Sequence, residues 1–76
     1  AMTANEVIYG HAIIADDTRR DVHLKLLHDR DDLFRWYTED GVGLQEEGRT
    51  VGEAWNMLVH DSYITHWELR FLSDWE

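Results

Sequence analysis

The sequence predicts a small α+β domain: an antiparallel four-stranded sheet with one helix packed on one face, in the order β-β-β-α-β. Three observations predict this fold. First, segments that alternate between apolar and polar residues come before and after a single helix-start signal. Second, turns rich in aspartate separate these segments. Third, the 76 residues contain no repeat and no composition shift that would mark a second domain. We therefore expect 1–76 to form a single small domain, and we expect Ala1 to be a remnant ahead of a natural start at Met2.

The first strand is predicted within residues 5–15, NEVIYGHAIIA, where β-branched and apolar residues dominate. Apolar residues fall on both of its faces, which is typical of a central strand or of a strand with a partner on its second side. Leu27 and Ile64 are expected on outer faces of their strands. Together these apolar positions leave a homodimer open as an interpretation.

A hairpin is predicted from residues 21–28 and 33–38, which alternate between apolar and polar side chains. A three-residue loop between them would set the register, and one face of both strands would then carry the large apolar residues. The expected pairs are Leu26 with Phe34 and Leu24 with Trp36. Residues 39–48 are polar and glycine-rich, so we expect a loop there, with at most a short extended piece at 42–44.

One helix is predicted over about 51–61. Thr50 and Glu53 form a capping box, in which the threonine hydroxyl accepts from the Glu53 amide and the glutamate reaches back to the Thr50 amide. Apolar residues then recur at helical spacing and would cover the sheet: Val51, Ala54, Trp55, Leu58 and Val59. A fourth strand is predicted at 63–71, with Trp67 on the face toward the helix.

The charge balance is strongly acidic, since the chain has sixteen acidic and seven basic residues and a net charge of −9. Such a charge repels phosphates, so we expect no direct binding to nucleic acid and none to a membrane. No apolar run approaches the roughly 18–20 residues of a membrane span and no signal-peptide pattern opens the sequence, so a cytoplasmic location is expected. The acidity has three open interpretations: ordinary solubility, adaptation to a salty environment, or imitation of nucleic acid.

No catalytic constellation is found in the sequence. It contains no cysteine, and neither of its serines lies in a nucleophile elbow. The five histidines lack zinc-site spacing, and residues 29–40 match a calcium loop poorly, because Leu33 stands where a ligand is needed. We therefore predict a protein that is not an enzyme and has no cofactor and no metal. A ligand or metal site that uses His11 and His23 across the first hairpin stays as a minor alternative.

The acidic residues gather in predicted turns rather than in one tail. Turns 16–17 and 39–40 are expected at one end of the sheet and 29–32 at the other. Seven acidic residues in or near these turns form the predicted partner-binding site: Asp29, Asp31, Asp32, Glu39, Asp40, Glu46 and Glu47. Carboxylates in turns are solvated and charged, so they can steer a basic surface toward the protein.

Residues 33–58, LFRWYTEDGVGLQEEGRTVGEAWNML, resemble the amino-terminal domain of HicB-type antitoxins. The resemblance rests on Gly48, Thr50, Glu53 and Ala54, which match the family's glycine-x-threonine-x-x-glutamate-alanine motif at the start of its helix. It covers about a third of the chain and implies a β-β-β-α-β fold and a protein-binding role. The proline-containing loop before the family's helix is missing here, and no DNA-binding segment follows the last strand. The resemblance therefore does not imply a repressor.

By type, the protein also resembles small acidic phage-encoded inhibitors of host enzymes, including anti-CRISPR proteins, which implies carboxylates that occupy a basic nucleic-acid groove. The predicted function is thus a non-catalytic acidic inhibitor or binding protein that blocks the basic nucleic-acid-binding surface of a partner protein. The alternative is a HicB-like antitoxin module that binds a small toxin. Its anchors would be Trp75, Tyr37 and Ile64.

Overall fold

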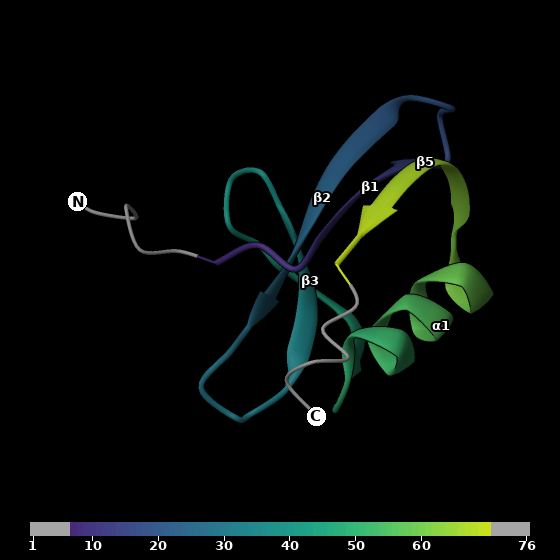
Figure 1. Cartoon of the computed structure of the whole chain (residues 1–76). Coiled ribbons are helices and arrows are strands. Elements are labelled where there is room, and N and C mark those ends of the chain that lie inside the picture. Colours follow the sequence, from purple (N-terminus) through teal and green to yellow (C-terminus); the bar gives the residue numbers. More distant parts are fainter. Residues whose placement is uncertain (1–6, 71–76) are drawn as a thin grey trace.

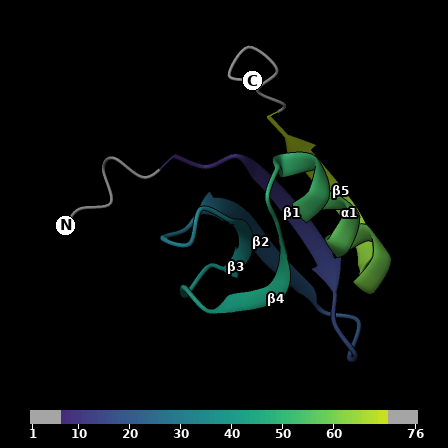
Figure 2. The same ribbon diagram turned by 90° about the horizontal axis from the view of Figure 1, so that it is seen from below.

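The computed structural model describes residues 7–70 of the chain (Figure 1). Its elements in chain order are β1 (Gly10–Ala15), β2 (Asp21–His28), β3 (Phe34–Thr38), β4 (Gly43–Gly48), α1 (Val51–Asp61) and β5 (Tyr63–Leu69). The strands form one antiparallel sheet in the spatial order β4-β3-β2-β1-β5. The helix lies on one side of this sheet (Figures 1 and 2), so the predicted α+β class is confirmed.

The sheet has five strands, so the predicted number of four is wrong. The additional strand is β4, in the segment that we expected to be a loop. It is an edge strand with an irregular register, because Arg35 lies opposite Glu47 whereas Tyr37 lies opposite Gly43. Polar residues and irregular pairing are common at sheet edges, where one side of the strand meets solvent. The polar composition of 39–48 therefore concealed a strand.

The register of the β2–β3 hairpin differs from the expected one by two residues. Leu26 lies opposite Trp36, and Leu24 lies opposite Thr38. The cause is a longer turn that Asp29 organises: its amide donates to the Leu33 carbonyl at 2.8 Å. An even shift keeps every side chain on its face of the sheet, so the predicted apolar face survives although the predicted pairs were wrong.

The core lies between this apolar face and α1. Trp36, Leu26 and Leu58 are the largest fully buried side chains. The indole Nε1 of Trp36 donates to the carbonyl oxygen of Ala54 at 2.9 Å, which fixes the helix to the middle of β3. Buried tryptophan normally has such a partner for its N–H, because an unpaired polar group in the core is costly. Among the described residues, the buried core consists of Tyr9, Ala12, Leu24, Leu26, Trp36, Val51, Ala54 and Leu58.

The helix begins at the predicted cap. The hydroxyl of Thr50 accepts from the Glu53 amide at 3.0 Å, as expected. The carboxylate of Glu53 instead accepts from the amide of Arg49 at 2.8 Å, so the second half of the predicted capping box reaches one residue further back. Of the predicted apolar stripe, Val59 is 49% exposed and does not belong to the core.

Strand β5 carries a bulge that sequence alternation did not predict. Its register with β1 shifts between Ile13 and Ile14, which leaves Thr65 as an extra residue. The bulge changes which residues point toward the helix, so Ile64 packs against the core instead of lying on an outer face. Trp67 keeps its predicted side but is 53% exposed, and its ring lies 4.9 Å from that of Trp55.

Candidate partner-binding surface

The acidic residues lie at two opposite ends of the sheet. Antiparallel pairing brings turns 16–17 and 39–40 to one end and turn 29–32 to the other, as predicted. The same pairing adds Glu46 and Glu47, at the end of β4, to the side of turn 29–32. The predicted site is therefore divided into two acidic ends. We call them the 29–32 end and the 39–40 end.

At the 29–32 end, two of the predicted acidic residues, Asp29 and Glu47, form ion pairs with Arg35. The guanidinium of Arg35 forms ion pairs with Glu47 and with Asp29, the latter over 3.3 Å between Nε and Oδ2. Its Nη1 also donates to the Leu44 carbonyl at 3.3 Å, so it links β3 with β4 and the turn. The positive charge of Arg35 offsets much of the charge of these two acids. They maintain the local structure more than they offer charge to a partner.

Asp29 also shapes the turn that carries the next two acids. Its Oδ1 accepts from the amides of Asp31 at 3.0 Å and Leu33 at 3.2 Å. An aspartate that accepts from amides two and four residues later fixes a turn in one conformation. Asp32 has a positive φ of 62°, a conformation that aspartate tolerates better than most residues. The tip of this turn is therefore ordered before any partner arrives.

Asp31 and Asp32 are the exposed acids of this turn. The side chain of Asp32 is 92% exposed, and its Oδ1 lies 2.8 Å from Nε2 of His28. The imidazole of His28 is in turn stacked on Phe34, with ring centroids 4.5 Å apart. Both aspartates, with Arg49, line a shallow hollow of about 250 Å³. Asp31 and Asp32 therefore place two exposed carboxylates around one hollow of the predicted site.

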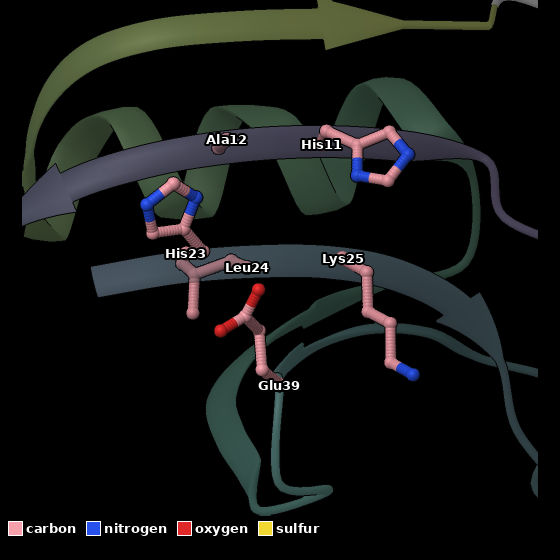
Figure 3. A pocket seen from close by; sticks show the side chains of 6 residues that line it. All are labelled: His11, Ala12, His23, Leu24, Lys25 and Glu39. Atoms are coloured by element: carbon pink, nitrogen blue, oxygen red, sulfur yellow. The ribbon is translucent and has the colours of Figure 1, made fainter. Parts of the chain in front are cut away.

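Glu39 and Asp40 lie at the opposite end, in the β3–β4 turn. Asp40 accepts a hydrogen bond from the hydroxyl of Thr38, whose Oγ1 accepts from the Val42 amide at 3.1 Å. Gly41 completes the turn with a φ of 92°, in the region that favours glycine. Asp40 is thus engaged in its own turn. Glu39 is exposed and extends toward β2 (Figure 3).

Glu39 borders a second hollow of about 320 Å³ that lies on the sheet surface away from α1. We call this surface the open face; the residues on it that concern the site are His11, Ile13, His23, Lys25, His66 and Glu68. Figure 3 shows the side chains of His11, His23 and Lys25 on this face, with the helix behind the sheet. His11 pairs with Lys25, and Ile13 pairs with His23.

This register bears on the alternative histidine site. His11 and His23 are not direct cross-strand partners, because His11 lies opposite Lys25 and His23 lies opposite Ile13. Among residues 7–70, no three histidine, aspartate or glutamate side chains come close enough together to hold a metal ion. The hollow beside Glu39 is therefore a polar surface depression of mixed charge.

The side chain of Glu46 lies on the side of β4 that faces the helix. It forms a hydrogen bond with Asp61, the last residue of α1. Burial raises the pKa of its carboxyl, and the nearby carboxyl of Asp61 raises that pKa further. A hydrogen bond with His60 lowers the pKa of Asp61, and a hydrogen bond with Glu46 adds to this effect. Two acids in contact compete for one proton, so their titrations belong to the pair. At neutral pH this contact places like charges next to each other.

Replacement of Glu46 by glutamine is therefore expected to raise the stability of the protein at neutral pH. A raised pKa in the folded state means that the contribution of Glu46 to stability is fully present below the usual glutamate pKa and is lost as the pH rises through the raised value. The neutral glutamine does not undergo this loss. Urea unfolding of both proteins from about pH 4 to about pH 7 tests this. Equal midpoints across the range would show that the Glu46–Asp61 contact has no energetic effect.

Comparisons of the chain with protein-family models, curated proteins and solved structures found no match. The resemblance to HicB-type antitoxins and the likeness to phage inhibitors therefore stay predictions. Within residues 7–70, no helix has the length and apolar character that crossing a membrane requires.

Two exposed aromatic side chains were not recognised as a surface from the sequence. Tyr63 is 73% exposed and Trp67 is 53% exposed, both on the edge strand β5. Sequence alternation placed them on the covered face, because it cannot show that β5 lies at the edge or that it carries a bulge. Of the anchors expected for an antitoxin-like partner, Ile64 packs against the core, Tyr37 is half-buried, and Trp75 lies outside the described residues.

Proposed function

We propose that this protein is a non-catalytic binding protein that places its 29–32 end against a basic, nucleic-acid-binding surface of a partner protein and thereby blocks it. The observation that carries the proposal is the net charge of −9 together with the exposed, adjacent carboxylates of Asp31 and Asp32 on an ordered turn. Nucleic-acid-binding surfaces are built from lysine and arginine to receive phosphates. Closely spaced carboxylates can bind to the same groups.

The order of the turn supports this function. Asp29 and Arg35 fix the backbone under the two carboxylates, so little conformational entropy is lost when a partner binds. Complementary charge accelerates encounter and excludes acidic surfaces, and its effect falls with ionic strength. Binding through this end should therefore be fast, selective for basic partners and sensitive to salt.

The second acidic end extends the proposed surface. Strand β3 has five residues, so it separates the 29–32 and 39–40 ends by about 17 Å at 3.3–3.4 Å per residue. Along the axis of a DNA double helix, one strand has about five phosphates over the same length, at roughly 3.4 Å of axis each. A basic groove that accommodates a short strand of nucleic acid could then contact Asp31 at one end and Glu39 at the other.

The double variant Asp31→Asn/Asp32→Asn should bind the partner several-fold more weakly than wild type at about 50 mM salt, with a smaller difference at about 500 mM. Asp29 is left intact because it holds the turn. The matched control is Asp17→Asn/Asp21→Asn, which removes the same charge from the β1–β2 turn and the start of β2, at the opposite end of the sheet from Asp31 and Asp32. Surface plasmon resonance with the captured partner gives both rate constants, and the loss is expected mainly in the association rate. An equal loss in both variants would assign the effect to total charge and refute the 29–32 end as the site.

A further inference from the structure

In the part of the chain that the structure describes, one edge of strand β5 has no partner strand. It is the last strand in the sheet order, and no strand of residues 7–70 lies beyond it. The amide of Arg70 donates to the Tyr9 carbonyl at 2.9 Å, so the backbone groups of Arg70 point toward the β1 side. These groups alternate in direction along an antiparallel strand. The N–H and C=O groups of Leu69 and Trp67 therefore point away from the sheet and can pair with another strand.

Within the described residues 7–70, this edge has few of the features that usually prevent strand addition. Soluble proteins protect edges with lysine, proline, bulges or a covering segment. β5 reads YITHWEL, with no lysine, no proline and a single acidic residue, and its bulge lies in the first half, away from Trp67. The opposite edge, β4, has two glutamates and an irregular register. Of the two edges, β5 is the one suited to pairing.

We propose that β5 is a dimer interface, at which a second copy of this chain adds its own β5 in antiparallel orientation about a two-fold axis at Trp67. A two-fold axis perpendicular to the sheet keeps each face on its side, so both helices lie on the same side of one continuous sheet. Trp67 then pairs with Trp67 of the partner subunit. Its backbone groups point outward in both subunits, as such a pair requires.

The register about Trp67 is self-complementary. On the open face it places His66 opposite Glu68 of the partner subunit, and Glu68 opposite His66 of the partner subunit. Residues opposite each other on one face are in contact distance, and a histidine N–H can donate to a carboxylate. A shift of the register that centred the axis on His66 or Glu68 would place like residues opposite each other. Hydrogen-bond complementarity thus supports a second copy of the chain as the partner and favours this register over those centred on His66 or Glu68.

On the helix side, the aromatic residues support the same arrangement. Trp67 is half-exposed beside Trp55, with ring centroids 4.9 Å apart, and Val59 is exposed on the same helix. Pairing two β5 edges would bring these apolar groups from both subunits around the two-fold axis. Aromatic residues at the centre of an interface contribute much of its binding energy. The exposed aromatic surface of Trp67 would thus be buried at the dimer interface.

The interface leaves the proposed partner-binding surface free. Turns 29–32 and 39–40 connect β2, β3 and β4, which lie on the far side of β1 from β5. Strand β2, the nearest of the three, is two strand spacings from β5, at about 4.8 Å per spacing. A dimer would present these acidic ends twice. The dimer proposal does not depend on the proposed function, and either can fail alone.

Sedimentation equilibrium of the full chain, from about 5 to about 200 µM, tests the proposal, because dimerisation follows mass action. Wild type is expected to dimerise within this range. His66→Glu puts glutamate opposite the partner's Glu68 twice and should raise the dissociation constant at least about tenfold. The double variant His66→Glu/Glu68→Lys creates an opposite-charge pair in this register and should recover the dimer. His23→Glu, on the open face two strands away from the edge, is the matched control and should dimerise like wild type.

Three outcomes would overturn the proposal. A wild-type protein that stays monomeric over the whole range has no such interface. Equal dimerisation of wild type and His66→Glu would place the interface elsewhere. A double variant as weak as His66→Glu would refute the register, provided that circular dichroism shows all variants to be folded. The double variant separates a local charge effect from a loss of fold, because it carries the same His66→Glu change.

Discussion

Replacement of Trp36 by alanine is expected to lower the free energy of unfolding by about 3–5 kcal/mol, the largest stability effect of any single substitution considered. The indole is completely buried among the core residues and donates from Nε1 to the Ala54 carbonyl. A domain of this size has only about 5 kcal/mol of stability, near the lower end of the usual range. The variant should thus retain only about 0–2 kcal/mol of stability, and far-UV circular dichroism should show a urea midpoint far below that of wild type.

The control for this prediction is Trp36→Phe. Phenylalanine fills much of the indole volume but cannot donate to the Ala54 carbonyl, so it should cost roughly 1–3 kcal/mol. The difference between the two variants then reflects the cavity. A Trp36→Ala protein with the urea midpoint of wild type would show that the helix does not depend on this side chain.

Gly48→Ala is expected to destabilise the protein by about 3 kcal/mol, the upper range for overpacking. A Cβ at position 48 would lie 2.5 Å from the Cβ of Glu53 and 2.6 Å from the amide nitrogen of Ala54. These atoms belong to the rigid first turn of α1, which cannot yield as a flexible side chain does. The helix would have to move away from the end of β4, and its contact with Trp36 would be disturbed.

Gly52→Ala is the matched control, only four residues away. A Cβ there would meet nothing closer than the Thr50 hydroxyl at 3.8 Å, and alanine favours helix more than glycine by up to about 1 kcal/mol. This variant should therefore be slightly more stable than wild type in the same urea titration. If Gly48→Ala were as stable as Gly52→Ala, the close approach of β4 and α1 would not exist in solution.

These two positions also explain the motif that resembles HicB-type antitoxins. Gly48 permits close approach to the helix, Thr50 caps it, and Glu53 accepts from the Arg49 amide. Ala54 is fully buried, and its carbonyl accepts from Trp36. Each residue of the motif has a role in joining an edge strand to a helix, so the motif is sufficiently explained by packing.

The elements with strong local signals could be predicted from the sequence. The helix and its cap follow from Thr50 and from apolar spacing, and the faces of β2 and β3 follow from alternation. The register did not follow, because the hydrogen bonds of Asp29 lengthen the turn in a way that its sequence does not specify. The bulge at Thr65 and the polar edge strand β4 depend on neighbouring strands and have no local signal.

The candidate site shows the same division. Its acidic composition and the placement of turns 29–32 and 39–40 at opposite ends could be predicted. The pairing of Asp29 and Glu47 with Arg35 could not, because it depends on the β3–β4 register. The contact between Glu46 and Asp61 likewise requires the helix end to meet an edge strand that was not expected. The number and position of the acidic residues could therefore be predicted from the sequence. Which of them remain available to a partner depends on the tertiary structure.

The central claim is that the acidic protein occupies a basic nucleic-acid-binding surface. Its most direct test is capture of partners from host lysate on immobilised wild-type protein at about 50 mM salt, followed by elution with either duplex oligonucleotide or about 500 mM salt. We predict that a nucleic-acid-binding protein is retained, that both eluents release it, and that immobilised Asp31→Asn/Asp32→Asn retains much less of it. A retained partner that neither nucleic acid nor salt releases would contradict the claim, and so would the absence of any retained protein.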